Sequence, residues 1–170
     1  GGKSNLLASQ LLDEYGYKIR DIKNEKEYNI ISISWISKNS TDETDSNNRE
    51  MKFYIVNDKG KNLIARPISV ITKNWESYES NYVNYKYPEN VNINSYMAEI
   101  NYLDNEIGRL LDVFEIELKD KLYYFITTSQ TECGSLMYQR PSNGYAVPSL
   151  KIVVSTTAHN LHEAVHVLDH

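Results

Sequence analysis

The sequence predicts an α+β fold, in which an antiparallel sheet of five to seven strands is covered by a central helix and a C-terminal helix. Segments with strand-like patterns follow one another in runs, whereas a parallel α/β fold would alternate strands with helices. Apolar residues recur at helical spacing over residues 95–112 and again near the C-terminus. We therefore expect one globular domain over residues 1–170, beginning with a flexible tether at residues 1–5.

The N-terminal half is expected to contain one helix and an antiparallel meander. Four leucines, at positions 6, 7, 11 and 12, predict a helix over residues 6–15. Residues 28–36 are rich in β-branched and aromatic side chains, with serines on one face, and indicate a strand. The polar residues 40–48 predict a loop. Strands over 51–56 and 63–71 then flank the turn Asn57-Asp58-Lys59-Gly60.

The clearest helical pattern lies in the C-terminal half. The residues that recur at helical spacing are Tyr96, Ile100, Leu103, Ile107 and Leu110, and Asn94 or Ser95 can serve as N-cap. Residues 114–118 and 122–128 predict a hairpin. Residues 133–148 contain two prolines and two glycines and predict a loop, after which 150–155 form the last strand.

All four histidines lie in the last twelve residues, where His162-Glu163-Ala164-Val165-His166 matches the pattern H-E-x-x-H. Two histidines four apart on a helix stand one above the other, so both imidazoles can bind one zinc ion while the Glu acts as general base. Thr156 or Thr157 can cap this helix. We expect Leu161, Val165 and Leu168 to be buried and the opposite face, with His159 and Glu163, to remain accessible.

This motif resembles the active-site helix of zincin-type metallopeptidases. The resemblance covers about a dozen residues and implies a zinc-dependent, peptidase-like hydrolase with His162 and His166 as metal ligands and Glu163 as general base. In those families a third ligand lies downstream of the motif, which here requires the parent chain to continue past His170. Peptide deformylases are similar in outline and take their third ligand, a cysteine, from upstream.

The resemblance to peptide deformylases implies Cys133 as the third zinc ligand. His170 cannot serve from the same helix, because it lies about 12 Å along the axis from His162, whereas each zinc ligand lies about 2 Å from the ion. The remaining sources are a residue upstream, such as Cys133, or another chain. A small buried thiol is the competing interpretation of Cys133.

The composition restricts the classes of partner. Eighteen Lys and Arg against 23 Asp and Glu give a net charge of −5, and no basic run is present, so we expect no nucleic-acid partner. No apolar run is long enough to span a bilayer. The segment Gly1-Gly2-Lys3-Ser4-Asn5 resembles the tether that follows the acylated cysteine of bacterial lipoproteins. It therefore predicts an extracytoplasmic protein with a lipid anchor upstream of Gly1.

A second functional hypothesis is a non-catalytic extracytoplasmic domain that binds a protein or peptide partner. Its surface would be the tyrosine-rich segment 74–92, whose aromatic residues are Trp75, Tyr78, Tyr82, Tyr85 and Tyr87. Such side chains can stack on a partner, but they also pack over sheet edges. Metal content distinguishes this hypothesis from the zinc hydrolase.

Overall fold

The computed structural model describes residues 15–37 and 49–168. The chain divides into two compact units, Gly1–Arg66 and Pro67–His170, whereas the sequence predicts one domain. The two units carry separate sheets of four and five strands, together with helices, and the α+β class is confirmed. Within residues 15–37 and 49–168, the strands form two sheets and not the single antiparallel sheet of five to seven strands that the sequence predicts. The expected tether 1–5, the loop 40–48 and the helix 6–15, apart from Tyr15, lie outside the described residues.

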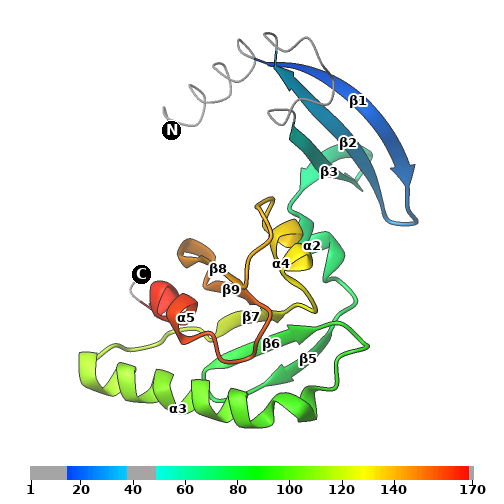
Figure 1. The fold of residues 1–170 in the computed structure, drawn as a ribbon. Helices are drawn as coiled ribbons and strands as arrows, with labels where there is room; N and C mark the ends of the chain where they lie inside the picture. Colours follow the sequence, from blue (N-terminus) through cyan, green and yellow to red (C-terminus); the bar gives the residue numbers. More distant parts are fainter. Residues whose placement is uncertain (1–14, 38–48, 169–170) are drawn as a thin grey trace. The chain divides into compact units, whose positions relative to one another are not determined.

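The first unit contains a four-stranded antiparallel sheet in the order β1-β2-β3-β4 (Figure 1). Its strands are β1 (Tyr15–Asn24), β2 (Tyr28–Ser37), β3 (Arg49–Asp58) and β4 (Lys61–Ala65). The predicted strands 28–36 and 51–56 are confirmed, and so is the turn before β4. Lys59 and Gly60 there have φ angles of 50° and 81°, the left-handed pair that a two-residue hairpin turn requires.

The second unit contains a five-stranded mixed sheet in the order β5-β6-β7-β9-β8. Its strands are β5 (Glu76–Glu79), β6 (Val83–Tyr87), β7 (Leu122–Ile126), β8 (Gly144–Val147) and β9 (Ile152–Ser155). Its helices are α2 (Pro67–Ile71), α3 (Met97–Phe114), α4 (Gln130–Leu136) and α5 (Leu161–Leu168), with short 3₁₀ turns η1 (Ile93–Tyr96) and η2 (Pro148–Leu150). β7 pairs in parallel with both β6 and β9, while the two outer pairs are antiparallel.

Several local predictions for the second unit are wrong. The hairpin expected over 114–128 does not form, because α3 continues to Phe114 and crosses over to bring β7 parallel to β6. Residues 67–71 are the helix α2, since Pro67 starts a helix more readily than it continues a strand. The expected loop 133–148 contains the end of α4 and all of β8. α3 itself matches the predicted central helix closely, although Asn92, not Asn94 or Ser95, caps the turn before it.

Side chains that alternate along β7 and β9 divide the core of this unit into two clusters. Tyr124, Ile126 and Val153 pack on one face with apolar residues of α3 and α5. Phe125 and Val154 point to the other face, where they meet α2 and α4. Figure 1 shows α3 and α4 on opposite sides of the sheet. The helix with the histidine motif therefore belongs to the α3 face.

Candidate functional site: the histidine pair of α5

Helix α5 is capped by Asn160. Its side-chain oxygen Oδ1 accepts a hydrogen bond from the Glu163 backbone N–H at 3.3 Å, and its carbonyl accepts one from the Ala164 N–H at 3.2 Å. The expected caps, Thr156 and Thr157, instead lie in the turn after β9. An Asn just before an apolar helical stretch is a recognisable cap signal, so the sequence could have indicated this residue.

The helix docks through a slightly different apolar stripe from the one predicted. Ala164, Val167 and Leu168 are buried, and Leu161 packs partly against the same cluster. Val165 is 42% exposed, so its predicted burial is wrong. The predicted and the observed stripes are both apolar. The observed stripe contains the small Ala164, which allows the helix to lie closer to the sheet. The expected accessibility of His159 and Glu163 is confirmed.

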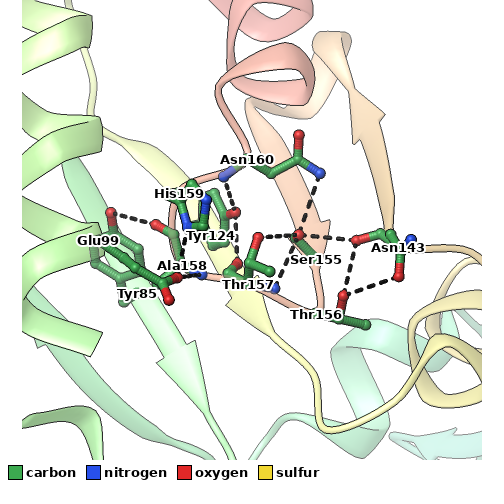
Figure 2. Close-up of polar contacts among 10 residues, drawn as sticks. All are labelled: Tyr85, Glu99, Tyr124, Asn143, Ser155, Thr156, Thr157, Ala158, His159 and Asn160. Atoms are coloured by element: carbon green, nitrogen blue, oxygen red, sulfur yellow. Dashed lines mark hydrogen bonds and ion pairs between the residues drawn. The ribbon is translucent and has the colours of Figure 1, made fainter. Parts of the chain in front are cut away.

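Ser155, at the end of β9, connects the segment before α5 to the neighbouring strand (Figure 2). Its buried hydroxyl donates to the Asn143 carbonyl at 2.9 Å and accepts from the Thr157 N–H and the Asn160 side-chain amide, each at 3.3 Å. Because all of its hydrogen-bonding capacity is directed at backbone and cap groups, this serine has a structural role.

Side chains from three further elements hold the same segment. Tyr124 of β7 donates its hydroxyl hydrogen to the Thr157 carbonyl at 2.8 Å and accepts from the Asn160 N–H at 2.9 Å. Glu99 of α3 accepts from the Ala158 N–H at 2.8 Å, and its carboxylate lies 2.7 Å from His159 Nδ1. Tyr85 of β6 donates to the Ala158 carbonyl at 3.4 Å. The start of α5 is thus fixed to the sheet and to α3 (Figure 2). No sequence pattern indicated Glu99 or Tyr124 for this role.

His162 and His166 are brought together on the exposed side of α5. Their Nε2 atoms are 3.3 Å apart, and the rings are nearly perpendicular, with centroids 4.7 Å apart. Without a metal ion, this contact allows one ring N–H to donate to the other ring nitrogen. Both side chains are exposed, so both nitrogens can be reached by an ion from solution.

Glu163 leaves α5 toward β8 and is half-buried. A side chain at Gly144 of β8 would come within 3.0 Å of the Glu163 Cγ atom and would collide with the Asn160 amide nitrogen. Gly144 is therefore required for the close packing of α5 on β8. No local sequence pattern indicates this contact, because it depends on the pairing of β8 with β9.

Cys133, the predicted third ligand, does not join the two histidines. It is fully buried in α4, in the cluster on the opposite sheet face, and its thiol donates to the Val154 carbonyl at 3.6 Å. Burial raises the pKa of this thiol to about 11, which favours the protonated form that does not bind zinc. Among residues 15–37 and 49–168, no group of three or more His, Cys, Asp or Glu side chains is arranged to hold a metal ion.

The tyrosine-rich segment of the second hypothesis contributes its aromatic side chains largely to packing within the second unit. It builds β5 and β6, in which Tyr85 and Tyr87 are buried. Tyr78 and Tyr82 pack against the α3-side cluster, and Trp75 packs against the other cluster, 6.4 Å from the Phe125 ring. These aromatic side chains serve the core because the sheet is covered on both faces.

No protein-family model, curated protein or solved structure matches this chain. Within the described part of the chain, no helix has the length and apolar character needed to cross a membrane.

Proposed function

We propose that the protein binds a zinc ion through His162 and His166, and that this ion serves a peptidase-like hydrolase in which Glu163 is the general base. The observation that carries the proposal is the 3.3 Å separation of the two Nε2 atoms. Two nitrogens that bind one tetrahedral zinc ion at about 2.0–2.1 Å are roughly 3.3–3.4 Å apart. The pair is thus spaced for one ion without movement of the helix.

The anchoring of α5 supports the same proposal. Tyr124, Glu99 and Ser155 accept hydrogen bonds from backbone N–H groups of the segment that leads into the helix, so the backbone under both histidines is held in place. A preorganised pair loses less conformational entropy on binding an ion than a pair on a mobile segment. Imidazole nitrogen is also a preferred zinc ligand.

Hydrolysis places a further requirement on the site. A bound zinc ion would act as a Lewis acid toward a substrate carbonyl. Glu163, one residue from His162 on the same helix, would accept the proton of the attacking water. Catalytic zinc sites usually have three protein ligands. In this proposal the third comes from outside residues 15–37 and 49–168, or from another chain, because Cys133 is buried in the opposite cluster.

Zinc binding is tested by titrating the metal-free full chain with zinc and measuring affinity by calorimetry. His162→Ala and His166→Ala should each weaken binding by more than about tenfold, since loss of an outer-shell partner alone costs 10- to 100-fold. His159→Ala is the matched control, because it removes a histidine that contacts Glu99 and leaves the pair intact. Equal affinity in all four proteins would contradict the proposal.

The hydrolase step is tested separately with a peptide library and zinc-loaded protein. Glu163→Gln should retain zinc affinity and lose cleavage, because the amide cannot accept the proton. If the wild-type chain binds zinc but cleaves no peptide, the hydrolase proposal is wrong and the proposal of a zinc site is still supported.

A further inference from the structure

The exposed side of α5 consists of the two motif histidines and one valine. His162, Val165 and His166 are the exposed residues of this helix, and its other residues are buried or half-buried. None of the three is Lys, Arg, Asp or Glu, and imidazole binds zinc in its neutral form. Two copies of this surface can therefore meet around a zinc ion without repulsion between like-charged side chains.

The histidine pair supplies half of the ligands of a tetrahedral zinc ion. Structural zinc sites have four protein ligands, and catalytic sites usually have three and a water molecule. Among residues 15–37 and 49–168, no third His, Cys, Asp or Glu is arranged with the pair to hold a metal ion. Two positions on the ion are therefore open to ligands from outside the described part of the chain.

A second copy of the chain offers two ligands with the spacing that the open positions need. All edges of a regular tetrahedron have the same length, so the two open positions are as far apart as the two that one pair fills. The Nε2 atoms of His162 and His166 are 3.3 Å apart in each copy. A two-fold axis through the ion places the second pair on the opposite edge, which gives the self-complementary contact of a symmetric dimer.

Val165 contributes apolar surface next to this contact. At 100° per residue, it lies about 60° from His162 around the helix, on the side that would face the second copy. Its side chain is 42% exposed although the rest of the apolar stripe of α5 is packed on the sheet. A second helix brought close by the shared ion removes part of this apolar surface from water, and this burial favours the dimer.

We propose that one zinc ion joins two copies of the chain, with His162 and His166 of each copy as its four ligands. The proposal rests on the zinc site proposed above and identifies the second chain as another copy of this one. In the dimer all four positions on the ion are occupied by protein, so no water is bound there for Glu163 to activate. The dimer is thus the resting form of the proposed hydrolase, and cleavage requires an ion with an open position.

Sedimentation velocity of the metal-free full chain, before and after addition of zinc, tests this dimer. Half an equivalent of zinc should double the mass of the sedimenting species, and a chelator should reverse the change. His162→Ala and His166→Ala should each keep the starting mass. His159→Ala is the matched control and should dimerise like the wild type, because it removes a histidine that contacts Glu99 and leaves both ligands in place.

The zinc content of each species is measured as well, so that the result does not depend on the variants alone. Half a zinc ion per chain in a species of doubled mass supports the proposal. One ion per chain at the single-chain mass overturns the dimer and leaves the zinc site supported, whereas no bound zinc contradicts the zinc site too. A dimer with one ion per chain, or one that forms without zinc or in His162→Ala, also overturns the shared four-histidine site.

Discussion

At the scale of single residues, Gly144 determines how closely α5 approaches β8. We predict that Gly144→Ala destabilises the protein by roughly 1–3 kcal/mol, the usual effect of overpacking. The new Cβ would collide with the Asn160 amide and press on Glu163, so zinc affinity should fall as well. Urea unfolding and zinc calorimetry measure the two effects.

Gly108→Ala is the control for this prediction. Its new Cβ in α3 would meet only the end of the Tyr82 side chain, at 3.1 Å, and alanine favours a helix. The change in stability should therefore be small. If both variants lose the same stability, the close approach of α5 to β8 is not what Gly144 provides.

The histidine motif also shows how far single residues could be predicted. The spacing of His162 and His166 was sufficient to predict that they lie together, because four residues make about one helical turn. The third ligand could not be placed. Cys133 resembles the upstream cysteine of the deformylases only in its order along the chain, and this order does not determine its position in the fold. Its position depends on the sheet face that carries α4, and this follows from strand pairing, not from local sequence. The buried face of α5 was equally ambiguous, as Val165 and Ala164 are both apolar.

At the scale of elements, the N-cap of α5 connects the helix to the rest of the sheet. Asn160→Ala removes the acceptor for the Glu163 N–H and the donor to Ser155, and we predict a loss of about 1 kcal/mol. Zinc affinity should weaken in parallel, because both histidines lie within two turns of the cap.

Asn160→Asp separates these two contributions. Aspartate caps a helix about as well as asparagine, so it keeps the bond to Glu163 and loses only the donor to Ser155. Its stability, measured by thermal unfolding, should therefore lie between those of the wild type and Asn160→Ala. If Asn160→Asp is as unstable as Asn160→Ala, the cap contributes little and the link to Ser155 dominates.

Elements with a regular local pattern were predicted well, and those defined by distant pairing were not. α3 and β2 carry unbroken periodicity of apolar residues. The Lys59-Gly60 turn is recognisable because it contains a glycine, which readily adopts the positive φ found there. β1 was missed because its bulge interrupts the alternation of apolar residues. β7 was assigned to a hairpin, since a run of apolar residues does not reveal whether its partner is antiparallel and adjacent or parallel and distant.

At the scale of the whole molecule, the second unit buries several groups that lose a proton only in strong alkali. Burial raises the pKa of the Cys133 thiol from its ordinary value of 9.0 to about 11. Burial also raises the pKa of the Tyr85 and Tyr124 hydroxyls above their ordinary value. The folded chain therefore holds these protons more tightly than the unfolded chain does.

This difference fixes the direction in which stability changes with pH. The unfolded thiol loses its proton first as the pH rises, so the contribution of Cys133 is complete below about pH 9 and is lost progressively toward pH 11. The two tyrosines extend the loss to still higher pH. We predict that the free energy of unfolding falls steadily across this window, as measured by urea titrations at several pH values.

Cys133→Ala isolates the thiol from the tyrosines. The smaller side chain also removes packing in the α4-side cluster, and this part of the loss does not depend on pH. The decline between pH 9 and 11 should be shallower than in the wild type, since one of the proton-binding groups is gone. Parallel curves for the two proteins across this window would show that the thiol does not hold its proton more tightly in the folded chain. A shallower curve in the variant assigns that part of the alkaline loss to Cys133, which α4 buries in the cluster with Phe125 and Val154.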